Sequence, residues 1–189
     1  MDPHNTNLYT LGKGILHIAD YDDTCGALVY RDLGNCPRLE VEVTEETLPH
    51  FSSRAGTKTK DKIVILETGY NVNFDLDEMA VRNLQVFLKA TLTTGPTLCA
   101  NTVLNKEYAL KFKSDNPVGF NETWEFYRVK LSPGGPLNLI GDEWMTMSFV
   151  GEGLNDTCHS TCPYFWVGVT TTSSTSTTST SSSSSSTEP

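Results

Sequence analysis

The residues with the clearest chemical potential lie in the polar segment EETLPHFSSRAGTKTKDK, at positions 45–62. His50 is followed closely by Ser52 and Ser53, and this grouping could place a general base beside a nucleophile. Catalytic triads, however, are assembled from separate structural elements, and the chain contains no Gly-x-Ser-x-Gly nucleophile elbow. We therefore interpret the segment as a long polar loop between two strands.

A second group of reactive side chains lies near the end of the chain, in the sequence CHSTC. Cys158, His159 and Cys162 are weak candidates for part of a zinc site, because a closed site needs four ligands and no matching second cluster occurs. The alternatives are two buried or edge thiols, or a disulfide between Cys158 and Cys162 after release from the cell. We expect no metal and no other cofactor.

The acidic stretch DYDDT resembles part of a calcium loop. Counting from Asp20, the sixth residue is Cys25 and the twelfth is Arg31, whereas an EF-hand requires glycine and glutamate at these positions. We expect a solvated turn here, because aspartate is common in turns.

Composition narrows the possible functions. The chain has 189 residues, of which 38% are hydrophobic, so one well-buried core is expected. Its net charge of -9 argues against nucleic-acid binding, because lysine and arginine supply most of that affinity. No signal peptide or membrane-spanning stretch is recognisable, and we expect the protein to be made and kept in the cytosol. Disulfides are rare in the cytosol, and the chain has five cysteines at irregular spacing, so we expect reduced thiols and no disulfide framework.

Most of the chain has the alternating pattern of half-buried strands. In PRLEVEVTEET, for example, Leu39, Val41 and Val43 alternate with polar residues. The predicted strands span residues 37–47, 67–76, 107–114, 122–131 and 143–150, with shorter ones at 14–20 and 26–33. The polar segment described first is then a loop from about Thr47 to about Asp61, and residues 132–142 form a hairpin connection rich in glycine and proline.

One segment, LDEMAVRNLQVFLKA at residues 76–90, has helical spacing instead. Asp77 occupies the position of an N-cap, and a helix of about three turns is expected to pack on the sheet. Its packing residues are Leu84, Phe87 and Leu88.

The chain divides into a domain at residues 1–169 and a Ser/Thr-rich C-terminal tail at residues 170–189. The tail lacks the apolar side chains that a core needs, so we expect no contribution from it to the core.

The most specific block of the chain is LGNCP before a strand, then LPHFSSRAG and KDK, a further strand, and DEMAVRNL. LGKGILHIADYD precedes this block, and LIGDEWMTMSFVGEGL follows it. The order of these segments resembles the tail tube, or major tail, proteins of bacteriophages with long non-contractile tails (siphovirus type). The resemblance covers roughly residues 8–154. The Ser/Thr tail and the CHSTC segment depart from the family.

This resemblance implies a mainly β fold, a β-sandwich or partly open barrel with one packed α-helix. It implies a structural virion protein whose hexameric rings stack into the tube that conducts the genome during ejection. The implied partners are other copies of the chain and the tape-measure, tail tip and tail terminator proteins, with viral DNA passing through without specific binding. The implied locations are the virion tail and, during assembly, the host cytoplasm, with no membrane contact and no enzymatic activity.

The resemblance also assigns roles to particular residues. The loop from His50 to Lys60 is expected to contact the neighbouring ring. The candidate contact residues are His50, Ser52, Arg54, Lys58 and Lys60. Glu40 and Glu42 could face the lumen and repel DNA phosphates, although a solvated outer face would give the same alternation.

Two other classes of function remain open. A capsid or tail decoration module would bind without polymerising, with its Ser/Thr tail as a tether or a contact to host glycans. A small hydrolase would require His50 to act together with Ser52 or Ser53.

Overall fold

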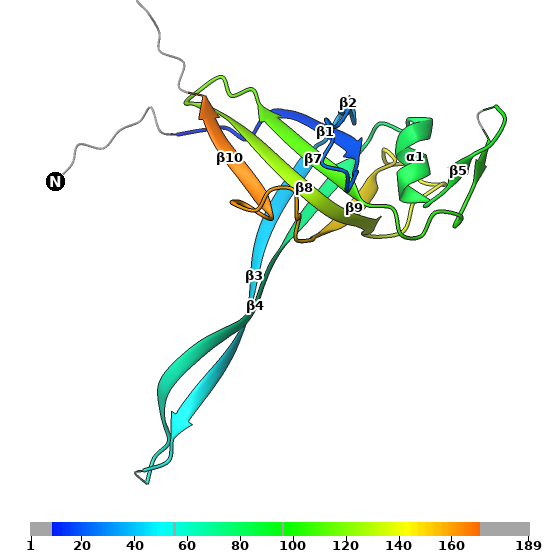
Figure 1. Cartoon of the computed structure of the whole chain (residues 1–189). Coiled ribbons are helices and arrows are strands. Elements are labelled where there is room, and N and C mark those ends of the chain that lie inside the picture. The colour runs from blue at the N-terminus through cyan, green and yellow to red at the C-terminus, as the bar shows by residue number, and fades with distance from the viewer. Residues whose placement is uncertain (1–8, 55, 96, 171–189) are drawn as a thin grey trace, which may run out of the picture.

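The computed structural model describes residues 9–54, 56–95 and 97–170 and has a mainly β architecture with one α-helix (Figure 1). The predicted fold class is confirmed. The elements are β1 (Gly14–Asp20), β2 (Arg31–Asp32), β3 (Arg38–Ser52), β4 (Thr59–Leu76), α1 (Val81–Phe87), β5 (Thr91–Leu92), β6 (Leu98–Cys99), β7 (Tyr108–Ser114), β8 (Asn121–Pro133), β9 (Met147–Gly153) and β10 (Phe165–Thr170).

Most strands form one antiparallel sheet in the order β2, β1, β7, β8, β9, β4, β3. The first half of β8 also pairs with β10, and its second half pairs with β9. A separate pair, β5 and β6, extends the molecule beyond α1 (Figure 1). Strand β10 ends at Thr170, the first residue of the predicted tail, and residues 171–189 lie outside the part of the chain that the structure describes.

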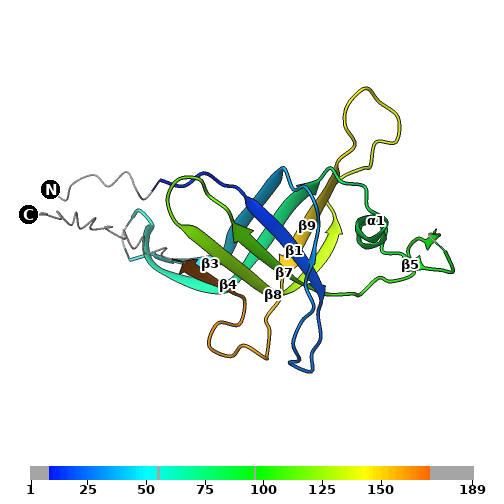
Figure 2. The ribbon, with the colours of Figure 1, turned by 90° about the horizontal axis from the view of Figure 1, so that it is seen from above.

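The sheet curls around a single core, as Figure 2 shows from above. Alternate residues of each central strand point inward, as Tyr70, Val72, Phe74 and Leu76 do on β4. The two ends of the sheet face each other across a crevice of about 770 Å³ that Leu16, Leu39, Val41 and Trp124 help to line. The curled sheet is therefore a partly open barrel. The buried core consists of Leu16, Ile18, Leu33, Tyr70, Val72, Phe74, Leu76, Phe87, Tyr108, Leu110, Phe126, Val129, Leu131, Met147 and Phe149.

The helix is shorter than predicted and begins later. It has seven residues, and Ala80 occupies its N-cap position without a side-chain cap. The predicted cap, Asp77, instead accepts a hydrogen bond of 2.6 Å from Asn35 Nδ2. The prediction was wrong because the helix begins only at Val81, so Asp77 belongs to the connection between β4 and the helix.

Two of the three predicted helix-packing residues contact the core. Phe87 is buried and meets Phe149 edge to face, with ring centroids 5.4 Å apart, and Leu84 is partly buried. Leu88 is exposed, because it lies at the C-cap of so short a helix. Asn83 is buried instead and donates to the Leu33 carbonyl at 2.8 Å. None of the helices in the described part of the chain is long and apolar enough to cross a membrane.

Candidate assembly surface

The most unusual feature of the molecule is a two-stranded arm, defined here as residues 44–69, that projects from the curled sheet (Figure 1). Strands β3 and β4 remain paired from Arg38 and Asp75 down to Ser52 and Thr59. Strand β9 accompanies β4 only as far as Asn71, so beyond that point the two strands leave the sheet. Apart from the partly exposed Pro49, Ser52 and Gly69, every described residue of the arm is exposed.

Both faces of the arm carry apolar side chains. Leu48 pairs with Val64 on one face, and their exposed fractions are 57% and 45%. Pro49 pairs with Ile63 on the other face, where Ile63 and Ile65 are each 54% exposed. A lone two-stranded hairpin is at best marginally stable, and apolar area exposed on this scale marks an interaction surface. The arm is therefore a candidate interaction surface.

The structure corrects the prediction of a loop between Thr47 and Asp61. Strand β3 continues to Ser52 and β4 begins at Thr59, so only residues 53–58 connect the strands. Two register shifts, after Glu46 and after His50, interrupt the ladder as bulges. The sequence obscured these strands because neither face is buried, and an unburied ribbon needs no polar and apolar alternation.

The predicted contact residues gather at the far end of the arm. His50, Ser52 and Lys60 lie on its strands, and Arg54 and Lys58 lie in the connection. His50 Nδ1 lies 2.6 Å from Asp61 Oδ1, so its hydrogen-bond partner is a carboxylate on the opposite strand. In the described residues no hydrogen bond joins His50 to Ser52 or Ser53. This end of the arm is basic and apolar, and among its described residues His50 is paired with a carboxylate and not with a serine.

The two predicted lumen residues lie where β3 still belongs to the sheet. Glu40 and Glu42 are exposed, and they alternate with the partly buried Leu39 and Val41. They sit on the outer face of the curled sheet, opposite Asn73 and Asn71 in the ladder. A lumen-facing role for these two residues remains a prediction.

A second exposed apolar segment connects β8 to β9, and we call residues 134–146 the Trp144 loop (the yellow loop at the upper right of Figure 2). Ile140 and Trp144 are 97% and 95% exposed. The predicted strand at residues 143–150 began too early, because β9 starts only at Met147 and Trp144 precedes it. The sequence analysis therefore did not identify Trp144 as a surface residue. Its position beside a segment rich in glycine and proline was the feature that could have indicated a loop.

The Trp144 loop borders a hollow of about 970 Å³, which we call the Trp144 hollow. Its other wall is the connection between β4 and α1, which contributes Asp77 and Met79. Asp142 and Glu143 add two more carboxylates, and the lining contains no lysine or arginine. The hollow is thus acidic and apolar, the opposite charge to the end of the arm.

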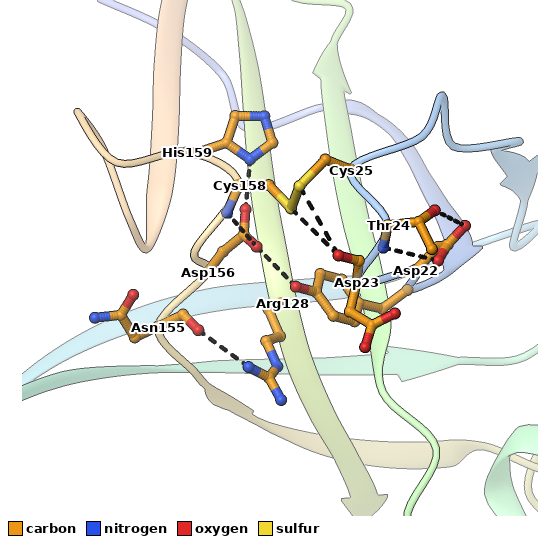
Figure 3. The surroundings of a disulfide bond; sticks show 10 residues. Asp22, Asp23, Thr24, Cys25, Arg128, Asn155, Asp156, Cys158 and His159 are labelled. Atoms are coloured by element: carbon orange, nitrogen blue, oxygen red, sulfur yellow. Dashed lines mark hydrogen bonds and ion pairs between the residues drawn. A yellow bond between two sulfur atoms is a disulfide. The ribbon is translucent and has the colours of Figure 1, made fainter.

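The cysteines give the clearest correction to the sequence analysis. Cys25 and Cys158 form a disulfide, with Cα atoms 5.5 Å apart across a sequence separation of 133 residues (Figure 3). The prediction of reduced thiols is wrong for this pair, and Cys162 is a free, exposed thiol instead of the partner of Cys158. No local spacing could reveal the pair, because the sheet alone brings the loop after β1 beside the β9–β10 connection.

A hydrogen-bond network reinforces the same junction (Figure 3). The buried Asp156 carboxylate accepts from Tyr21 Oη at 2.8 Å and from the Cys158 backbone amide at 3.2 Å. Its other oxygen lies 2.5 Å from His159 Nδ1, and the His159 ring stacks on Tyr127.

The network shifts the pKa values of its members. Burial acts to raise the pKa of Asp156, but hydrogen bonds from His159, Tyr21 and Cys158 outweigh it and leave the pKa below its usual value. Burial, together with the bond to Asp156, raises the pKa of Tyr21 to about 12. The carboxylate is therefore ionised and the phenol protonated at neutral pH, which is the state in which they bond.

The same arrangement shows where the residues of the two candidate metal segments lie. Cys158 is occupied by the disulfide and His159 by Asp156, so the set Cys158, His159 and Cys162 does not converge on a common point. In the described ranges no three histidine, cysteine or acidic side chains are grouped to hold an ion. The DYDDT segment ends in the expected turn, where Asp22 accepts from the Thr24 amide and hydroxyl.

Comparison with known proteins identifies a family but no activity. A family model described as "Protein of unknown function UCP028589" matches residues 9–103, slightly more than half of the chain. The matched region includes β1 to β6 and the whole arm, and it ends before the Trp144 loop and Cys158. No curated protein matches the chain.

Proposed function

We propose that this chain, which belongs to that family of unknown function, is a structural subunit that assembles with copies of itself. The resemblance to phage tail tube proteins favours a specific form of this proposal. In that form, hexameric rings of the chain stack into the tail tube of a bacteriophage with a long non-contractile tail. The tube would conduct the genome during ejection and would assemble on tape-measure, tail tip and tail terminator proteins.

The observation that carries this proposal is the arm. Its strands expose apolar side chains on both faces and offer unpaired backbone groups along their edges. Natural proteins avoid leaving such edges open, because any other strand can pair with them. An exposed, twisted ribbon of this length is therefore best explained as half of a protein interface.

Self-assembly fits the rest of the surface. The arm and the Trp144 loop are different surfaces of one chain, and a contact between different surfaces is heterologous. Heterologous contacts build rings when the rotation closes and filaments when it does not, whereas a self-complementary patch would stop at a dimer. Repeated head-to-tail contacts are the kind that a stacked tube requires.

The charge of the chain supports passage of DNA without binding. The net charge is -9, and Glu40 and Glu42 form an exposed acidic edge beside the asparagines of β4. If this face lines the tube, it repels phosphates and keeps DNA from adhering to the wall.

The proposal is tested by negative-stain electron microscopy of the purified protein over a range of concentrations. The intact chain is expected to form rings or hollow tubes. A matched variant replaces residues 46–67 by Asn-Gly, which joins the paired residues Glu45 and Thr68 through a two-residue turn. This armless variant should remain folded and monomeric.

Two results would contradict the proposal. If the armless variant formed tubes as well as the intact chain does, the arm would not be required for assembly. An intact chain that never forms rings or tubes, together with antibody labelling confined to the capsid of phage particles, would favour a decoration module instead.

A further inference from the structure

We infer that the Trp144 hollow of one copy receives the far end of the arm of a second copy. The inference rests on the proposed self-assembly and names the two surfaces that meet. Its occupant is a basic, apolar β-hairpin tip from an identical chain.

The arm supplies one side of this contact. Between Leu48 and Leu66 the sequence contains four basic residues, Arg54, Lys58, Lys60 and Lys62, and one acidic residue, Asp61. That acid is already bound by His50. Phe51 pairs with Lys60 in the ladder and is 47% exposed. An aromatic ring next to ammonium groups therefore forms the tip.

The hollow supplies the complementary side. Asp77, Asp142 and Glu143 line it, and its lining has no basic residue to oppose the lysines of the arm. Trp144 and Ile140 provide an almost fully exposed apolar wall. Opposite charges around an apolar centre favour both register and affinity, because buried aromatic anchors provide most of the energy and rim charges steer the approach.

The location of the two surfaces makes the contact intermolecular. The arm ends where β4 begins at Thr59, and the Trp144 loop joins the sheet at Met147, which pairs with Leu76 at the other end of β4. A strand rises about 3.3 Å per residue, so the 18 residues of β4 separate the two surfaces by about 55 Å. An arm therefore cannot reach the hollow of its own chain, and each copy presents a donor at one end and an acceptor at the other.

Carbodiimide cross-linking tests this contact directly, because the reagent joins amines to carboxylates that already form ion pairs. Nitrogen-15-labelled and unlabelled protein are mixed, assembled and cross-linked, and mass spectrometry then identifies peptides from different copies. We expect mixed-label links from Lys58, Lys60 or Lys62 to Asp142 or Glu143. Assembled protein without such links overturns the inference.

A charge exchange gives an independent test. One variant carries Lys58→Glu with Lys60→Glu, and the other carries Asp142→Lys with Glu143→Lys. Each variant alone should raise the critical concentration for assembly at least tenfold. An equimolar mixture of the two should lower it part of the way back, because each altered surface then meets one of opposite charge. The matched control is Lys13→Glu with Lys113→Glu, two exposed lysines outside both surfaces, which should assemble nearly as the unaltered chain does. Circular dichroism confirms that each variant is folded. Two altered pairs that assemble like the control would overturn the inference.

Trp144 fluorescence provides a third readout that requires no charge change. Docking should shift its emission to the blue as concentration rises, and Trp144→Leu should abolish that shift. Tubes without the shift or the cross-links would leave the proposed function standing and reject this contact. Cross-linked, blue-shifted oligomers that never form tubes would support the contact and reject the tube.

Discussion

Strands β3 and β4 have two different characters along their length. Near Arg38 and Asp75 they belong to the sheet, and β4 alternates buried and partly exposed residues from Gly69 to Leu76. In the arm the same strands continue with the same pairing but bury almost nothing. Backbone pairing alone therefore does not distinguish a core strand from an interface strand. The difference lies in whether a second layer covers the side chains.

The first test of this contrast removes a side chain from the covered half. Phe74 is 1% exposed and stacks on Phe149 with ring centroids 4.8 Å apart. Phe74→Ala should lower the free energy of unfolding by about 3–5 kcal/mol, because it leaves a cavity in a packed core. Urea unfolding at concentrations too low for assembly measures the change. A loss below about 1 kcal/mol would contradict the assignment of this half to the core.

The second test removes the disulfide that joins the loop after β1 to the β9–β10 connection. Cys25→Ser together with Cys158→Ser should lower the free energy of unfolding by about 2–5 kcal/mol, because the crosslink closes a long loop in the unfolded chain. Thermal unfolding with and without a reductant measures this. Cys162→Ser is the matched control, because its thiol is free and exposed. A variant as stable as the control would show that the bond is absent in solution.

The third test concerns the buried carboxylate at the same junction. Asp156→Asn should cost about 1–3 kcal/mol, since the charge-assisted bonds from Tyr21 and His159 are lost. The pKa of Asp156 is lower in the folded protein than in the unfolded chain. Its contribution to the free energy of unfolding is therefore complete above the pKa of the unfolded chain and is lost as pH falls through the pKa of the folded protein.

The unaltered protein should therefore lose stability as pH falls below about 4, and Asp156→Asn should lose less over that range. Urea unfolding at a series of pH values gives both slopes. Tyr21→Phe keeps the carboxylate but removes one hydrogen-bond donor, so the slope of its stability against pH should lie between those of the unaltered protein and Asp156→Asn. Equal acid slopes for the aspartate and asparagine proteins would exclude Asp156 from this stabilisation.

The smallest effect on the isolated chain is expected in the uncovered half of the ribbon. Ile63→Thr with Ile65→Thr should change monomer stability by less than about 0.5 kcal/mol, because both side chains are already exposed. Assembly should nevertheless weaken, which sedimentation velocity measures. Val29→Thr, at a position that is 89% exposed outside the arm, is the matched control. A large loss of monomer stability would show that the arm folds back onto its own chain.

Prediction from the sequence succeeded where one face of a strand is buried. Tyr70, Val72 and Phe74 alternate with polar residues because the pleat directs neighbours to opposite faces and only one face meets the core. The same reasoning identified Leu84 and Phe87 as the residues by which the helix contacts the sheet. It failed at Leu88, because helical periodicity continued in the sequence after the helix had ended.

The candidate surface was only partly predictable. The position and basic character of the segment from His50 to Lys60 were evident, but its extension as a paired ribbon was not. The apolar run from Ile63 to Leu66 reads as core in any sequence pattern, and only its exposure identifies it as an interface. The Trp144 hollow is built from two connections that lie far apart in the sequence, so no single segment could indicate it.

By itself the sequence determined the mainly β class, most of the strands in the sheet, the acidic charge and the basic end of the arm, because each depends on side-chain type and on spacing along the chain. The tertiary structure decided the disulfide between Cys25 and Cys158, the buried Asp156 network and the departure of the arm from the sheet. These features depend on which distant segments lie together and on what covers each face. Local sequence carries no record of either, because pairing partners are chosen by the packing of the whole chain.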